Sequence, residues 1–112
     1  MDNLIFYSHT DCLLKDNGLN HPERKERIET ILNSINQIED LSIINKNAPL
    51  AKLDVISNVH PIEYLNNMIS KIPITGFNKV EEEPYADTFL CKNSENAILR
   101  SCGAGIAAAD DL

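Results

Sequence analysis

Tryptophan is absent from this 112-residue chain, and aromatic residues together make up only 5% of it. A hydrophobic core must therefore consist mostly of Ile, Leu, Val and Ala, which offer few surfaces for stacking. The chain also has no run approaching about 18 consecutive apolar residues, and its N-terminus has neither a basic region nor a long apolar stretch. We therefore expect no membrane-spanning segment, no secretory signal and no membrane partner.

Cysteines are few and irregularly spaced. The three of them, Cys12, Cys91 and Cys102, are odd in number and form no Cys-x-x-Cys pair. The sequence therefore suggests neither a disulfide framework nor a structural zinc knuckle. A reducing, cytoplasmic location is the natural expectation.

Basic residues are in the minority. The chain has 10 Lys and Arg against 17 Asp and Glu, which gives a formal net charge of −7. Non-specific binding to nucleic acids or to anionic membranes requires an excess of Lys and Arg. We therefore expect no nucleic-acid partner.

Hydrophobic periodicity predicts an α/β fold for a chain of this length, which suits one small domain or part of a larger one. Residues 4–7 and 41–44 are short apolar runs typical of buried strands. Between them we expect a helix that begins at Pro22, directly after His21. The apolar residues of this helix repeat at helical spacing: Ile28, Ile31, Leu32, Ile35 and Ile38. A strand, a helix and a second strand of these lengths suffice for a parallel crossover.

Two stretches of the chain are predicted to be loops. Residues 8–21 have no apolar period, and Asn17-Gly18 within them is a typical turn. Residues 70–92 include three consecutive Glu at 81–83, which we interpret as a solvated surface. Long loops in compact domains are usually functional or disordered.

Three further helices are predicted. Residues 53–59 suggest a short helix, and a second one follows with Pro61 at its first position. The last begins at Asn93 or Ser94, both of which are good N-caps. This helix contains Gly103 and Gly105, each costing about 1 kcal/mol relative to Ala. Small residues there indicate close packing against a neighbour rather than ligand binding.

Residues that could perform chemistry within this chain are scarce. His9, His21 and His60 lie in separate segments and lack the His-x-x-x-His or Asp-x-His spacing of metal sites. We therefore expect no metal site made by this chain alone. His9 and Cys12 could be drawn as a base and a nucleophile, but we interpret Cys12 as an ordinary loop thiol. No glycine-rich loop suggests nucleotide binding.

Three segments give the chain a distinctive pattern. The first reads Asp16-x-Gly18-x-x-His21-Pro22-Glu23-Arg24-x-x-Arg27-Ile28, the second reads Val59-His60-x-x-x-Tyr64-Leu65, and the third runs from Asp87-Thr88-Phe89 into the Ala- and Gly-rich helix at 97–110. In this order they resemble elements of the histone deacetylase and acetoin-utilisation superfamily. Lys25 is a departure, because many members have Pro there.

The resemblance implies an arginase/deacetylase-like three-layer fold, with a parallel sheet flanked by helices. Residues 1–112 would be the N-terminal part of that domain, incomplete in this chain. In the family, a zinc ion held by two Asp and one His activates water to remove acetyl groups from lysine or polyamine nitrogen. The zinc ligands, the His dyad and the catalytic Tyr match no position here. The resemblance thus implies zinc and an acetylated lysine or acetylated polyamine substrate for the full-length parent, with no catalytic residue, metal ligand or cofactor in this chain.

The residues that the resemblance does carry over are secondary ones. Arg27 matches an Arg that lines the channel behind the zinc, where its guanidinium could hold a carboxylate product such as acetate. From the residues alone, surface ion pairing with adjacent Glu explains Arg27 equally well. His21 and Pro22 would shape the first active-site loop, and Asp87 matches a rim residue that binds substrate backbone.

Three readings of the chain remain open at this point. The leading one is the N-terminal segment of a zinc-dependent deacetylase, inert alone and completed by the missing C-terminal part of the domain. The second is a truncated, non-catalytic remnant that acts as a small interaction module, because its first strand would otherwise have an unpaired edge. The third is an unrelated small acidic α/β domain.

Overall fold

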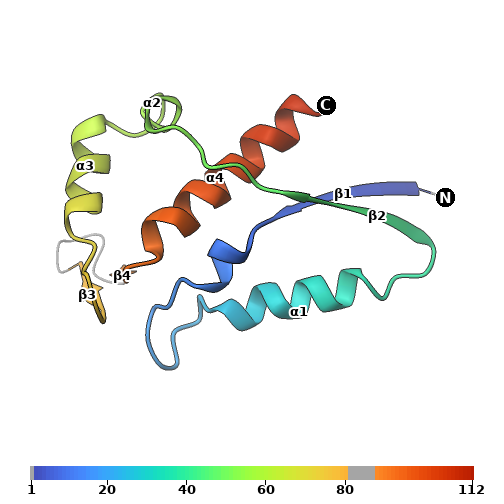
Figure 1. The fold of residues 1–112 in the computed structure, drawn as a ribbon, viewed down its shortest axis with the longest axis horizontal. Helices are drawn as coiled ribbons and strands as arrows, with labels where there is room; N and C mark the ends of the chain where they lie inside the picture. The colour runs from blue at the N-terminus through green and yellow to red at the C-terminus, as the bar shows by residue number, and fades with distance from the viewer. Residues whose placement is uncertain (1, 81–87) are drawn as a thin grey trace.

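The computed structural model describes residues 2–80 and 88–112 and contains a two-stranded parallel sheet, which lies at the right in Figure 1. Strand β1 (Asp2–Ser8) pairs with β2 (Leu41–Asn47) in a register that sets Leu4 beside Ile43. Helix α1 (Lys25–Ile35) connects the two strands. The chain is therefore a mixed α/β fold with a small parallel sheet flanked by helices, and the predicted strand–helix–strand crossover is confirmed.

The remaining elements follow β2 along the chain. They are the short helix α2 (Leu53–Ile56), helix α3 (Ile62–Ser70), the two-residue strands β3 (Asn78–Lys79) and β4 (Phe89–Leu90), and helix α4 (Ser94–Asp110). A 3-10 helix, η1 (Thr10–Leu13), follows β1. All three later helices were predicted from sequence, with α2 shorter than expected.

The start of α1 differs from the prediction. Helix α1 begins at Lys25 with Arg24 as its N-cap, whereas Pro22 and Glu23 lie in a bend before it. The cause is local hydrogen bonding, since the His21 Nδ1 accepts the Glu23 amide at 3.1 Å and the Asn17 Nδ2 donates to the Glu23 carbonyl at 3.0 Å. Such side-chain bonds compete with helix formation. Pro61 likewise proves to be the N-cap of α3, not its first residue.

The short β3–β4 hairpin was missed by the sequence prediction of a loop over 70–92. Asn78 pairs with Leu90 and Lys79 with Phe89 in antiparallel register, and the Val80 amide donates to the Thr88 carbonyl at 2.8 Å. Two-residue strands show no detectable alternation in sequence. Their pairing is a tertiary event, and Val80 is one of the most deeply buried side chains described.

Helix α4 lies directly against the segment that follows β2. The Ala51 amide donates to the Leu99 carbonyl at 3.0 Å, and a Cβ added to Gly103 would lie only 1.8 Å from the Pro49 carbonyl oxygen. Gly103 therefore permits backbone-to-backbone contact, which confirms the packing prediction at this position. In the part of the chain that the structure describes, and apart from the adjoining residues of α4, no atom lies within 4 Å of a Cβ built on Gly105, so the prediction does not extend to it.

The sheet is only partly covered. Leu4, Ile5 and Ile44 are between 37% and 43% exposed, although strands of parallel sheets are ordinarily buried on both faces. The radius of gyration is 15.7 Å, against about 13 Å expected for a compact domain of this length. The described residues thus form an open layer rather than a closed core. No described helix is long and apolar enough to cross a membrane.

Candidate functional site

The loop that the sequence singled out is ordered by its own hydrogen bonds. His9 caps η1 by accepting the Asp11 amide on Nδ1 at 3.0 Å. Asp16 Oδ1 accepts the Gly18 amide at 2.9 Å, and Gly18 has a φ of +98°, a conformation that favours glycine. The backbone turn lies later than predicted at Asn17-Gly18: its central residues are Leu19 and Asn20, and the His21 amide donates to the Gly18 carbonyl at 3.4 Å. The loop nevertheless has a defined path from β1 to α1.

His21 faces inward from this loop. Its ring meets the Phe89 ring edge to face, with 5.3 Å between centroids, so the loop before α1 touches strand β4. Pro22 is exposed, and so is Arg27, whose side chain lies on the outer surface of α1. Among the residues that the structure describes, Arg27 forms no side-chain hydrogen bond or ion pair. Asp87, the predicted rim residue, lies outside the described residues. The structure therefore brings His21 toward the later segments of the chain but does not bring Arg27 with it.

An ion pair that sequence reasoning missed joins this loop to α4. The Arg100 Nε donates to the Asp11 Oδ2 at 2.9 Å, and its Nη1 donates to the Ala48 carbonyl at 2.9 Å. Both charged side chains are about one-fifth exposed. Because His9 Nδ1 accepts the Asp11 amide, that nitrogen has no proton to share with the Asp11 carboxylate 3.2 Å away. The residues joined are 89 positions apart, and no spacing signal could have connected them.

The pKa values of two cysteine thiols, Cys12 and Cys91, are shifted in opposite directions. Burial, followed by the negative charge of Asp11, raises the pKa of Cys12. Its Sγ lies 3.8 Å from the Ala97 carbonyl oxygen, to which it can donate. Cys12 is thus a neutral thiol rather than an activated nucleophile. Burial opposes ionisation of Cys91 as well, but hydrogen bonds from the Asp16 amide at 3.3 Å, the Ser94 hydroxyl and the Asn93 amide outweigh it and lower the pKa of Cys91.

These opposite shifts predict opposite pH dependences of stability. The folded-state pKa of Cys12 lies above the unfolded value, so its contribution is complete below that value and is lost as pH rises through the folded pKa. The free energy of unfolding should therefore fall, relative to the Cys12→Ala variant, as pH rises above about 9, the ordinary pKa of a cysteine thiol. The folded-state pKa of Cys91 lies below the unfolded value, so its contribution is present above that value and is lost as pH falls through the folded pKa. The same comparison with Cys91→Ala should rise as pH approaches about 9 from below and should be level above it. Urea unfolding of the three proteins across pH measures both differences, and two differences of equal sign would contradict the assignment.

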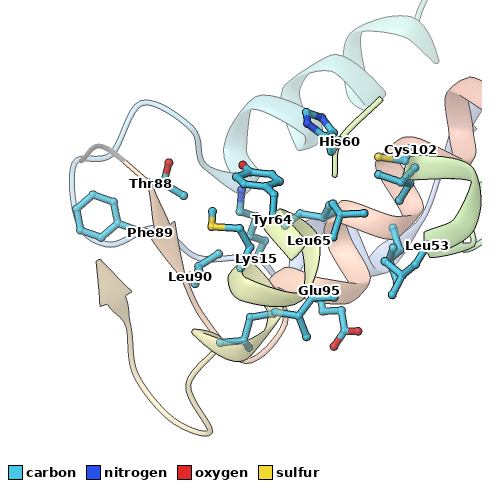
Figure 2. Close-up of a pocket in the computed structure, with 16 residues that line it drawn as sticks. Lys15, Leu53, His60, Tyr64, Leu65, Thr88, Phe89, Leu90, Glu95 and Cys102 are labelled. Carbon is cyan, nitrogen blue, oxygen red and sulfur yellow. The ribbon is translucent and has the colours of Figure 1, made fainter. Parts of the chain in front are cut away.

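A cavity of about 260 Å³ lies where α2, α3, β4 and α4 meet (Figure 2). Its wall is mostly aliphatic, with Leu53 from α2, Leu65 from α3 and Leu99 from α4 among the lining residues. His60 and Tyr64 line it as well, and their rings are 5.4 Å apart between centroids. Sequence reasoning did not find this cavity, because its wall is assembled from segments that lie far apart along the chain.

Within residues 2–80 and 88–112, no group of three or more His, Cys, Asp or Glu side chains is placed to hold a metal ion. No protein-family model matches the chain. A comparison with curated proteins gave no significant match either.

Proposed function

We propose that this chain is the N-terminal part of a deacetylase-like domain, and that it supplies an active-site wall rather than catalytic groups. The parent would be a zinc-dependent amidohydrolase that removes acyl groups from lysine or polyamine nitrogen. The zinc ligands and proton-transfer residues would come from a later segment. Alone, these 112 residues would be catalytically inert, because a zinc hydrolase without zinc ligands cannot activate water.

The observation that carries this proposal is the meeting of the three segments on which the resemblance rests. The His21 ring contacts Phe89, which joins the first segment to the third. The second segment, through His60 and Tyr64, lines the same cavity as Thr88 and the Ala- and Gly-rich helix α4. Segments that together border one active site must lie together in space. This arrangement supports the family proposal over an unrelated α/β domain.

The open sheet supports the same proposal. Leu4 and Ile5 of β1 and Ile44 of β2 are about two-fifths exposed, and a central parallel sheet of a three-layer fold would bury them under further strands and helices. Arg27 is also on an uncovered surface. A role for Arg27 in holding a carboxylate product requires that later segments cover this side of α1.

The proposal is tested by assay together with the coding sequence that follows Leu112. We expect the purified chain with zinc to show no hydrolysis of an acetyl-lysine substrate above the buffer rate. We expect a Gly-His-His-Ala element and then an Asp-x-His element in the downstream sequence. Expression with that downstream segment should produce zinc-dependent deacetylation, which Arg27→Ala should reduce and Arg24→Ala should not. Zinc-proportional turnover by the 112-residue chain alone would contradict the inertness, and a long downstream reading frame with neither element would contradict the family.

A second candidate function is favoured by the same exposed apolar strands. A non-catalytic interaction module would use β1 and β2 to pair with another chain, because an uncovered strand edge is a template for pairing. A stop codon directly after Leu112 would favour this function. A chain that is monomeric and melts cooperatively at every concentration would argue against it, since it would need no partner.

A further inference from the structure

Lys15 contributes a positive charge to the wall of the apolar cavity between α3 and α4. Its side chain is only 22% exposed, and its ammonium lies 3.9 Å from the nearest Glu23 carboxylate oxygen, on a Glu side chain that is 61% exposed. This distance is at the limit of an ion pair, and an exposed partner screens it further. The charge of Lys15 is therefore poorly compensated for a side chain that is mostly covered by protein.

The acidic residue of the same wall is differently placed. Glu95 lies in the first turn of α4, where the helix dipole stabilises a carboxylate. Figure 2 shows the Glu95 carboxylate pointing away from Tyr64. Lys15 thus supplies the positive charge of the cavity wall, although the chain as a whole is acidic.

The cavity volume restricts the size of a ligand. An apolar cavity of about 150 Å³ is enough to hold benzene, and pockets for drug-sized molecules begin near 300 Å³. At about 260 Å³, the space suits a molecule of roughly ten non-hydrogen atoms. The aliphatic side chains of Leu65, Ile69 and Leu99 would cover its apolar part.

We propose that this cavity binds a small monocarboxylate with an aliphatic or aromatic body. The carboxylate pairs with Lys15, and the body lies among the aliphatic side chains of α3 and α4. The site is distinct from the exposed face of α1 that carries Arg27, and the proposal does not depend on the proposed deacetylase parentage.

Octanoate, octylamine and octanol share one chain and differ in charge, so they test the proposal directly. Titrated into the ¹⁵N-labelled 112-residue chain, octanoate should shift the amide signals of cavity residues saturably and bind at least tenfold more tightly than octylamine. The Lys15→Met variant keeps most of the apolar stem. This variant should bind octanoate at least tenfold more weakly than the wild-type chain does, and its affinity for octanol should stay within about twofold. Leu65→Phe narrows the cavity and should lower the affinity for both octanoate and octanol.

Lys46→Met is the matched control, because Lys46 is an exposed lysine that pairs with Asp111 away from the cavity. It should leave octanoate affinity unchanged. The proposal is overturned if octylamine binds as well as octanoate, if Lys46→Met weakens octanoate as much as Lys15→Met, or if the shifts concentrate on β1 and β2. If circular dichroism shows that Lys15→Met does not fold, two tests still decide the proposal. Lys15→Arg, which keeps the positive charge, should bind octanoate within about threefold of the wild-type affinity. The three ligands of different charge can also be compared on the wild-type chain.

Discussion

Replacing Gly103 with alanine is expected to destabilise the chain by about 3 kcal/mol, the upper end of the usual cost of overpacking. The added Cβ would lie 1.8 Å from the Pro49 carbonyl oxygen and 2.7 Å from its carbonyl carbon. Both atoms are backbone, so no side-chain rotation can relieve the contact. Helix α4 would have to move away from residues 48–51, which would break the Ala51 to Leu99 hydrogen bond. Urea unfolding followed by circular dichroism measures the effect.

Gly105→Ala is the matched control on the same helix. Apart from the adjoining residues of α4, no atom of the described residues lies within 4 Å of a Cβ built there. Only helix propensity therefore changes, and we expect a gain of about 0.5 to 1 kcal/mol in the free energy of unfolding. The two substitutions should therefore have opposite signs although they add the same methyl group two residues apart. A similar loss for both variants would show that α4 responds to the removal of glycine in general, and that the Pro49 contact has no special role.

Replacing Arg100 with methionine is expected to cost about 1 to 3 kcal/mol. The substitution removes hydrogen bonds to Asp11 and to the Ala48 carbonyl, both 2.9 Å long. It also leaves the Asp11 carboxylate partly buried without its partner. Because both side chains are about one-fifth exposed, solvent screens part of the resulting loss of stability. Hydrogen exchange should also show faster exchange of the η1 amides, because Arg100 ties this turn to α4.

The control for this prediction is Lys46→Met. Lys46 also reaches α4, where its ammonium lies 2.9 Å from the Asp111 carboxylate, but the two side chains are 44% and 37% exposed. Exposed pairs contribute less than about 1 kcal/mol, so this variant should be close to wild type. If Arg100→Met lowers the free energy of unfolding no more than Lys46→Met does, solvent screens the Arg100–Asp11 pair as fully as the Lys46–Asp111 pair. The loop would then be held by its own hydrogen bonds.

Local patterns predicted much of the fold. The apolar runs and the helical stripe between them were enough to place β1, α1 and β2, because a parallel pair requires a crossover of that length. The early termination of α1 is a different matter: it ends at Ile35 although the stripe continues to Ile38, which is 48% exposed. Apolar spacing indicates which face of a helix is apolar but does not determine where the helix ends.

The candidate site was less predictable. The resemblance singled out His21 and Arg27 on one segment. In the structure the His21 ring contacts Phe89 three residues before α1 begins, whereas Arg27 lies on the exposed surface of α1. Side-chain hydrogen bonds to Glu23 set that difference, and they depend on the folded loop. The Asp11–Arg100 pair and the cavity wall arise from contacts between residues far apart in sequence, which no local spacing encodes.

Sequence patterns alone were enough to predict the α/β class, the parallel crossover and the need for a small residue in α4. These are properties of short segments, governed by apolar period, backbone freedom and side-chain size. Three features could be seen only in the folded chain: which glycine contacts the backbone, the position of Lys15 in the wall of an apolar cavity, and the opposite pKa shifts of Cys12 and Cys91. Each of these depends on burial and on distances between segments, and those quantities exist only once the chain has folded.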